Sequence, residues 1–519
     1  MSWEPEVEGI RERRRRAREH GGREAVAAHR ARGRLPVRER IDRLLDPGSF
    51  HEIGRIAGHG EVDDRGRLVS FTPANYVLGL GTIDGRRVAV GGEDFTLRGG
   101  SPTPAGLRKS VYAEDLCLRY RVPLVRLLEG GGGSVAGPAG RPGRPSGGDP
   151  VYARHRFVSM AEAMATVPVI SAALGPVAGL PAARLAASHL SLMTRETAQV
   201  LVAGPAVVER ALGERKTKEE LGGAEVHGRS GVVDVVAADE DEAFATVRRL
   251  LSYLPSNVYE RAPRLGHDDD PQRREEELLH LVPRNRRRTY DVRRLLRLVL
   301  DRDSFTELQP GHGRSLVVGL ARLAGQPVGV LANDPRHLAG AMDADAAEKF
   351  RRFVDFFDTF HLPVVAFVDE PGFMIGSAAE RAGTIRRGAR ALFAAVQSRV
   401  PWASVIVRRT YGVAAAAHFA PDAHVLAWPS AEGGALPVEG GVAVAFRREI
   451  ESAPDPERRR AELEEQLAAG RTPFPRAEAF GVHDLIDPRE TRPELCAWIE
   501  WIQPLLDRDL GPRSYSIRP

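Results

Sequence analysis

The feature that most constrains the fold of this chain is an internal repeat with a period of about 240 residues. The segment LLDPGSFHEI at 44–53 recurs as VLDRDSFTEL at 299–308. Residues 109–132 align without a gap on residues 349–372. A period this long exceeds that of any solenoid repeat, so the repeat predicts two homologous domains.

Each copy shows the pattern of an α/β domain. A hairpin-like unit comes first, then a helix that contains Lys109 or Lys349, and then two strongly apolar strands. Apolar runs that end in Gly-rich turns and lead into helices predict a mostly parallel sheet covered by helices. The expected hairpins and strands are 79–90, 122–132 and 167–176 in the first half, and 318–331, 362–372 and 400–409 in the second.

The repeat also predicts where the domains end. We expect an exposed Arg-rich N-terminal helix over 1–32, packed on a partner or on the body of the protein, and a first domain over 33–264. The segment 265–288 is charged and has no periodic apolar stripe, so we interpret it as an interdomain linker. The second domain is expected over 289–519.

Composition excludes several classes of protein. Basic and acidic residues nearly balance, 74 against 70, and acidic residues interrupt the N-terminal Arg run, which argues against a nucleic-acid partner. Cys117 and Cys496 are far apart, which excludes a disulfide framework and a Cys-rich zinc site. Because the chain has no membrane-length apolar run and no signal-peptide core, we expect a cytoplasmic protein without a membrane partner. Since paired zinc ligands are lacking, we also expect no metal.

Three turns that follow apolar strands are candidates for chemistry. They are EGGGGS at 129–134, DEPGFMIG at 369–376 and RTYGVAAAAH at 409–418. Glycines at such turns let adjacent backbone N–H groups converge, and a following helix N-terminus favours an oxyanion. The alternatives are a surface loop for the first turn and core packing for Ala414 to Ala417. His418 and His424 look isolated, and no nucleophile elbow, P-loop or dinucleotide fingerprint is present.

Ordered motifs along the whole chain resemble the β (carboxyltransferase) subunits of acyl-CoA carboxylases, such as propionyl-CoA and methylcrotonyl-CoA carboxylases. The resemblance begins near Gly33 and continues to the C-terminus. Many independent motifs in the same order are more specific than any one of them. They are LPVRERIDRLLDPGSF at 35–50, GTIDGRRVAV at 81–90, EDFT at 93–96, RRLLSYLPSN at 248–257, PRHLAGAMDADAAEKF at 335–350 and AWPSAEGG at 427–434.

The resemblance implies two tandem crotonase-like (ββα-superhelix) domains and an enzyme of the transferase or ligase class. Acyl-CoA would bind the N-terminal domain, and carboxybiotin would face the C-terminal domain. The biotin would arrive on a separate biotin carboxylase or biotin carrier subunit, and the chain would form a homo-hexamer, a trimer of dimers. In the implied mechanism, biotin that has released CO2 removes the α-proton of the thioester, and the enolate then attacks CO2.

The resemblance also assigns site residues by position. Backbone N–H groups of Gly131 and Gly132 would hold the thioester oxygen, and those of Val413 and Ala414 would hold the ureido oxygen of biotin. The remaining predicted contacts are Gly133, Ser134, Gly175, Ala178, Gly179 and Ala416 for the substrate, and Gly372, Phe373 and Gly412 for biotin.

The chain departs from the family at these turns. Glu129-Gly-Gly-Gly-Gly-Ser134 stands where the family reads DSGGAR, and Leu180 ends a motif that usually reads GPCAGG. Ala416 replaces the aspartate of YGGAYD that helps to select the acyl chain, and Val413 adds bulk beside the expected biotin site. Three hypotheses follow: a carboxylase subunit with an unusual acyl substrate, a biotin-independent acyl-CoA decarboxylase or acyl transferase, and a non-catalytic paralogue that assembles with an active β subunit.

Overall fold

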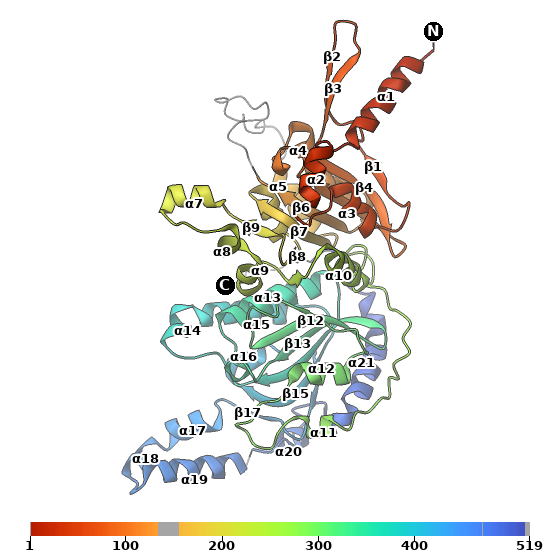
Figure 1. Cartoon of the computed structure of the whole chain (residues 1–519). Coiled ribbons are helices and arrows are strands. Elements are labelled where there is room, and N and C mark those ends of the chain that lie inside the picture. The colour runs from red at the N-terminus through yellow and green to blue at the C-terminus, as the bar shows by residue number, and fades with distance from the viewer. Residues whose placement is uncertain (1, 133–154, 470, 514–519) are drawn as a thin grey trace. The chain divides into compact units, whose positions relative to one another are not determined.

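The computed structural model describes residues 2–132, 155–469 and 471–513. The chain divides into two compact units, residues 1–260 and 261–519 (Figure 1). Each unit contains an eight-stranded mixed sheet. No helix of the described part of the chain has the length and apolar character needed to cross a membrane.

The sheet of unit 1 has the order β1-β4-β5-β6-β7-β8-β10, and β9 pairs with β7. β1, β4 and β5 are antiparallel, whereas β5, β6, β7, β8 and β10 are parallel. A separate hairpin is formed by β2 and β3. The elements of unit 1 are α1 Glu4–Ala17, α2 Arg23–Arg30, α3 Val37–Leu44, β1 His51–Ile53, β2 Gly58–Val62, β3 Leu68–Pro73, β4 Tyr76–Ile83, β5 Arg86–Glu93, η1 Arg98–Gly100, α4 Pro104–Tyr120, β6 Leu124–Gly130, α5 Arg156–Met164, β7 Val169–Ala178, α6 Leu180–Ala186, β8 Leu190–Thr194, β9 Gln199–Leu201, α7 Pro205–Leu212, α8 Lys218–Gly222, α9 Ala224–Ser230, β10 Val235–Ala237 and α10 Glu240–Ser252.

The sheet of unit 2 repeats this plan, with the order β11-β12-β13-β14-β15-β16-β18 and with β17 paired to β15. Its first three strands are antiparallel and the others are parallel. The elements of unit 2 are α11 Leu278–Leu281, α12 Val292–Val299, β11 Thr306–Leu308, β12 Leu316–Leu323, β13 Gln326–Asn333, η2 Leu338–Gly340, α13 Ala344–Thr359, β14 Val364–Glu370, α14 Ser377–Arg381, α15 Thr384–Gln397, β15 Trp402–Tyr411, α16 Gly412–Ala416, β16 His424–Ala427, β17 Glu432–Gly434, α17 Val438–Ala445, α18 Arg447–Ser452, α19 Pro456–Ala469, α20 Phe474–Glu478, β18 Asp484–Leu485, η3 Pro488–Glu490 and α21 Thr491–Leu506.

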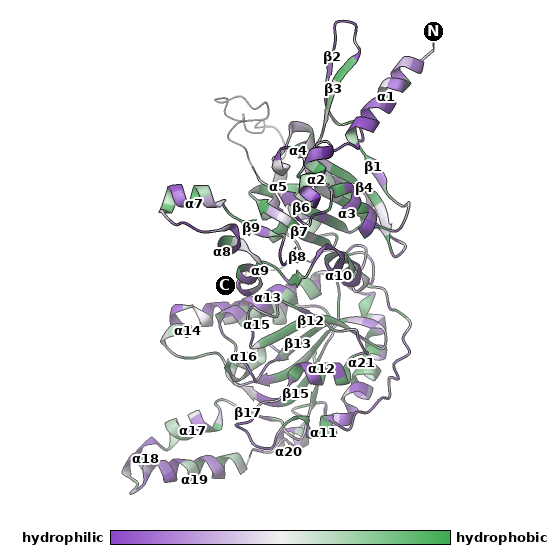
Figure 2. Ribbon diagram, in the orientation of Figure 1, coloured by the Kyte–Doolittle hydropathy of each residue, from purple (hydrophilic) through white to green (hydrophobic). Residues whose placement is uncertain are grey.

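Helices cover both faces of each sheet, which explains why the strands are apolar along their whole length. In unit 2, α12 and α21 pack on one face of the sheet, and α13 and α15 lie on the other (Figure 1). The green strands of Figure 2 show the apolar character of this core. Every residue of β12, β13 and β14 is buried. The layered α/β architecture predicted from the repeat is therefore present in both halves.

The recurring Leu-Asp motif has a structural cause. Asp46 accepts hydrogen bonds from the backbone N–H groups of Asp84 (3.0 Å) and Gly85 (2.9 Å), the two residues that turn the β4–β5 hairpin. Asp301 does the same for the β12–β13 hairpin, where it accepts from Ala324 (3.1 Å) and Gly325 (2.8 Å). Both turns have two residues with positive φ, the conformation that fits the twist of a hairpin.

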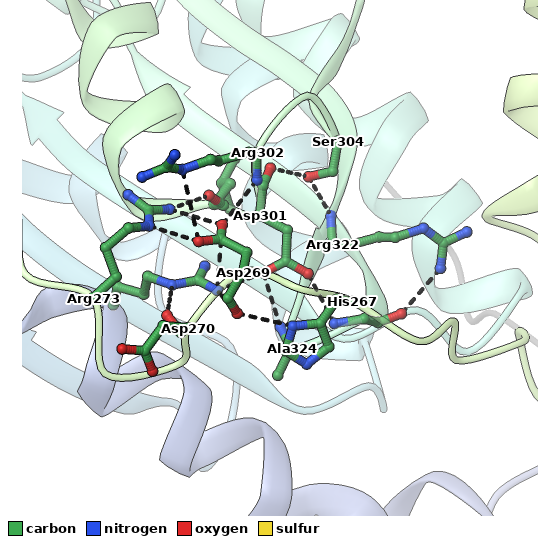
Figure 3. Close-up of polar contacts among 12 residues, drawn as sticks. His267, Asp269, Asp270, Arg273, Asp301, Arg302, Ser304, Arg322 and Ala324 are labelled. Atoms are coloured by element: carbon green, nitrogen blue, oxygen red, sulfur yellow. Dashed lines mark hydrogen bonds and ion pairs between the residues drawn. The ribbon is translucent and has the colours of Figure 1, made fainter.

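The charged segment 265–288, which we interpreted as the interdomain linker, belongs to unit 2 and is held there by polar contacts. Asp269 forms an ion pair with Arg273 (2.8 Å) and accepts the N–H of Arg302 (3.0 Å), as Figure 3 shows. Arg492 of α21 donates to the carbonyl oxygen of Asp270 (2.9 Å) and pairs with Asp301 (2.9 Å). Polar contacts thus fix the segment, and a sequence search for an apolar stripe does not detect them.

Candidate active site

Two turns of unit 1 meet where β6 and β7 end. The carboxyl ends of parallel strands lie at the same edge of a sheet, which is where α/β proteins bind ligands. Gly132 follows β6 with a φ of 73°, and Gly179 follows β7 with a φ of 65°. A Cβ atom at Gly132 would lie 2.9 Å from the carbonyl oxygen of Ala178, so the turns touch and only glycine fits.

The two glycines of the first turn differ in what their N–H groups do. The N–H of Gly131 donates to the carbonyl oxygen of Gly99 at 3.1 Å, so it is used within the protein. The carbonyl oxygen of Gly132 accepts from the Ser101 hydroxyl at 3.0 Å, while its N–H has no acceptor among the described residues. Of the predicted pair, only Gly132 therefore retains a donor for a ligand.

The second turn of unit 1 offers further donors. Gly179 is exposed and stands at the N-cap of α6, where no side chain accepts from the first N–H groups. Such groups have no partner inside a helix. Gly175 is instead buried in β7, where a Cβ atom would lie 2.3 Å from the Glu129 carboxylate, so this glycine makes room for Glu129. Gly133 and Ser134 lie outside the described residues.

Glu129, the first residue of the altered motif, is a buried structural carboxylate. Its side chain has 0% exposure and pairs with Arg40 at 2.6 Å and Arg34 at 3.1 Å. His29 lies 3.4 Å from the same carboxylate. Burial by itself would raise the pKa of Glu129, but the charge of Arg40 and the contacts with His29 and Arg34 outweigh it and lower the pKa.

Unit 2 has the same carboxylate at the equivalent position, Asp369. It pairs with Arg409 at 2.6 Å and Arg408 at 2.9 Å, and both arginines lie on β15. Burial raises the pKa of Asp369, and the two guanidinium groups reverse the shift and lower it. The replacement of the family's aspartate by Glu129 therefore keeps a buried, arginine-paired carboxylate at the end of the strand.

The second turn of unit 2 presents the predicted biotin-side donors. Gly412 has a φ of 64° and opens the short helix α16, which has no side-chain cap. Val413 is 61% exposed and Ala414 is buried, and both stand in the first turn of the helix, where N–H groups lack intrahelical acceptors. Ala416 is exposed on the same helix.

In the first turn of unit 2, both backbone polar groups of Gly372 are bonded within the protein. The N–H of Gly372 donates to Glu370 at 3.0 Å, and its carbonyl oxygen accepts from Met342 at 3.1 Å. Met374 donates back to the carbonyl oxygen of Met342 at 2.9 Å, so the N–H of Phe373 faces the opposite side of this extended segment. The Phe373 ring packs over α15, since a Cβ atom at Gly388 would lie 2.2 Å from it.

Sequence reasoning missed one contact beside these turns. Glu370 and His418 have side chains with 0% exposure, and Nε2 of His418 lies 3.4 Å from Oε2 of Glu370. His418 was interpreted as isolated, and its partner Glu370 is 48 residues away in the sequence. Among the described residues, no cluster of three His, Cys, Asp or Glu side chains could hold a metal ion.

Comparison with known proteins decides the family. The family model described as "Carboxyl transferase domain" matches residues 28–503. The chain belongs to the carboxyl transferase family. The carboxyltransferase subunit of propionyl-CoA carboxylase from Haloferax mediterranei is 36% identical over 503 residues, 96% of each chain. Methylmalonyl-CoA decarboxylase subunit alpha from Veillonella parvula is 33% identical and covers 94% of each chain.

A solved structure shows the same fold. The transcarboxylase 12S crystal structure, a hexamer with methylmalonyl-coenzyme A bound, matches with a TM-score of 0.86 and 33% identity, over 100% of this chain and 99% of that one. The chain is therefore an enzyme, a carboxyltransferase of the acyl-CoA carboxylase and transcarboxylase family, with two tandem crotonase-like domains.

Proposed function

We propose that this carboxyltransferase is the subunit of a biotin-dependent acyl-CoA carboxylase that moves CO2 from carboxybiotin to the α or vinylogous carbon of an acyl-CoA. The observation that carries the proposal is the paired arrangement of glycine turns, present once in each unit at the carboxyl ends of two parallel strands. Two such sites suit a reaction in which two oxygens gain negative charge, one on the thioester and one on the ureido group.

In unit 1, the thioester oxygen would be held by one N–H from each turn. Gly132 supplies the first donor, and the start of α6, at Gly179 and Leu180, supplies the second. This assignment replaces Gly131, whose N–H is already bonded to Gly99. Donors fixed by the backbone need no reorganisation when the enolate forms, which is why they stabilise it better than water does.

In unit 2, the ureido oxygen would be held by N–H groups of Val413 and Ala414, joined by Phe373 from the other turn. The residues fit such a group, because Gly412 and Val413 are exposed and α16 lacks a side-chain cap. Carboxybiotin, when bound, supplies CO2 and a nitrogen basic enough to take the α-proton. The chain itself orients the reactants and holds the two oxygens.

The remaining partners follow from the relatives. The transcarboxylase 12S structure is a hexamer, and we propose that this chain also forms a hexamer, arranged as a trimer of dimers. We also propose a cytoplasmic location and a separate biotin carboxylase or biotin carrier subunit.

A second candidate is an acyl-CoA decarboxylase that acts without biotin. The relative from Veillonella parvula, named as a decarboxylase subunit at 33% identity, favours it. The departures from the family motif at Val413 and Ala416 also agree with this candidate, because a decarboxylase of this kind would not need to bind biotin.

The experiment that separates these functions is a screen of acyl-CoA and carboxyacyl-CoA thioesters, with and without a carboxylated biotin carrier. Carboxylated product that forms only with the carrier supports the proposal. Loss of CO2 from a carboxyacyl-CoA in the absence of the carrier supports the second candidate. No binding of any thioester by calorimetry would contradict both and leave a non-catalytic paralogue.

A further inference from the structure

The carboxylate of Glu370, at the end of β14, holds together the backbone of the first turn of unit 2. Its Oε1 accepts the N–H groups of Gly372 (3.0 Å) and Met342 (3.3 Å). Its Oε2 accepts from the side-chain amide of Asn333 (3.0 Å). The side chain is completely buried, so these donors replace all the water that it would otherwise bind.

His418 joins this carboxylate to the second turn. It lies two residues beyond α16, and its carbonyl oxygen accepts the Ser404 hydroxyl at 2.6 Å. Its ring meets Phe350 edge-on, with 5.4 Å between ring centroids. Nδ1 has no hydrogen-bond partner among the described residues, so the contact of Nε2 with Glu370 at 3.4 Å is the ring's one polar contact there.

Unit 1 shows that the fold does not require this pair. By the gap-free alignment of the two halves, Gly130 is the counterpart of Glu370. Gly179 and Gly412 are equivalent left-handed glycines, which makes buried Leu185 the counterpart of His418. Unit 1 therefore builds the same two turns with apolar or small residues at these two positions, and its own contact between a histidine and a carboxylate, His29 with Glu129, lies elsewhere. Burying two polar side chains is costly. Because unit 1 forms its turns with Gly130 and Leu185 at these positions, the backbone of the turns does not by itself require Glu370 and His418.

We propose that Glu370 and His418 are positioning residues for the biotin-side turns, an inference that rests on the function proposed above. Glu370 takes up the N–H of Gly372 and so leaves the N–H of Phe373 as the donor that faces the ligand. His418 fixes the distance from that donor to the N–H groups of Val413 and Ala414. Neither side chain reaches the ligand, because both are fully buried.

Steady-state kinetics with a carboxylated biotin carrier and acyl-CoA tests the proposal. Glu370→Val removes the acceptor and Glu370→Gln keeps one. We expect Glu370→Val to raise KM for the carrier at least about tenfold, with KM for acyl-CoA within about twofold, because only the biotin-side donors move. Glu370→Gln should recover most of the affinity. His418→Leu, which installs the residue of unit 1, should give an intermediate rise.

His424→Leu is the matched control, since this histidine of unit 2 packs against His483 (4.8 Å between the centroids of the tilted rings) and pairs with Ala403, near the start of β15, whereas the turn follows the end of that strand. It should leave both KM values unchanged. An unchanged carrier KM in folded Glu370→Val, or equal losses in both KM values, would overturn the proposal. If Glu370→Val does not fold, the comparison of Glu370→Gln with His418→Leu decides, and a carrier KM unchanged in His418→Leu overturns it.

Amide hydrogen exchange separates this inference from the proposed function. If the wild-type enzyme transfers no CO2 from the carrier, the proposed function fails, but exchange can still be measured. We expect His418→Leu to accelerate exchange at least about tenfold in 371–374 and 412–418 and to leave 130–132 unchanged. Unchanged exchange in all these segments would overturn the positioning role by itself.

Discussion

The two units build the same pair of turns and secure them with different chemistry. In unit 1, the N–H of Glu129 donates to buried Glu93 at 3.3 Å, whereas in unit 2 the N–H of Asp369 donates to the amide oxygen of Asn333 at 3.0 Å. Burial raises the pKa of Glu93, and burial also raises that of Glu370. Each unit thus buries one carboxyl with a raised pKa beside its turns, but at different positions.

The shared parts and the differing parts have separate roles. Both units keep an arginine-paired carboxylate at the strand end and a left-handed glycine in each turn, because the backbone path requires them. The side chains behind the turns differ, and so do the sources of the arginines: Arg34 and Arg40 lie before and on α3 in unit 1, whereas both arginines of unit 2 lie on β15. The comparison indicates that the two units share one backbone scaffold and differ in the side chains that support its turns.

The largest expected effect is at Gly132 of unit 1. Gly132→Val combines a positive φ with a clash against the Ala178 carbonyl, and it should lower the rate of carboxyl transfer at least about 1000-fold by removing an oxyanion donor. Gly213→Val is the matched control, with a φ of 74° and nothing within 4 Å of the new Cβ atom. Both variants should assemble normally by size-exclusion chromatography. Full activity in Gly132→Val would refute the thioester site in unit 1.

Removing one arginine from the buried carboxylate should lower the free energy of unfolding more in unit 1 than in unit 2. Arg40→Met leaves the buried carboxylates of Glu129 and Glu240 without their shared partner and should cost about 3–5 kcal/mol. Arg409→Met should cost less, because Arg408 still neutralises Asp369. Denaturant unfolding of the two variants measures the difference. Equal costs would show that Arg34 and His29 already suffice for Glu129.

The two carboxylates that bind the hairpin turns, Asp46 and Asp301, should also differ in how much they stabilise the protein. Asp301 is buried and pairs with Arg492 at 2.9 Å, while Asp46 is more exposed and lies 3.5 Å from Arg248. Asp301→Asn is therefore expected to lower the melting temperature more than Asp46→Asn does. The reverse order would mean that the hairpin of unit 1 carries more of the stability.

The Asp46 variant should show a pH dependence. Hydrogen bonds from Thr82 and from the N–H of Gly85 lower the pKa of Asp46 from 3.8 to about 2. A lowered pKa stabilises the folded state above the unfolded value, and this contribution is lost as pH falls from about 4 towards 2. The difference in melting temperature between wild type and Asp46→Asn should accordingly shrink over that range. A constant difference would show that the charge of Asp46 contributes nothing.

The smallest effect is expected at Ala416 of unit 2. Ala416→Asp restores the family's residue at an exposed position, so stability should change by less than about 0.5 kcal/mol. If this residue helps to select the acyl chain, the ratio of kcat/KM values between two acyl-CoA lengths should shift. A ratio that does not change would remove Ala416 from the substrate-binding set.

Most of the fold could be predicted from the sequence, because it depends on local pattern. The alternation of apolar runs and glycine turns gave both sheets, and Asp84-Gly85 gave its hairpin turn correctly. The contacts that hold the segment 265–288 could not be predicted, because ion pairs such as Asp269–Arg273 leave no periodic signal in the sequence. A motif can identify a turn, but it does not show which N–H groups of that turn are already bonded.

The sequence by itself determined the duplication, the main strands of each half and the glycines that the turns need, because these follow from short-range periodicity and from the backbone freedom of glycine. Only the tertiary structure decided that Gly131 donates to Gly99, that Gly175 makes room for Glu129, and that Glu370 meets His418 across 48 residues. Those outcomes depend on the direction of N–H groups and on contacts between distant strands. The N–H directions and these contacts are set only when the strands pair in the sheet and the ends of neighbouring strands lie side by side.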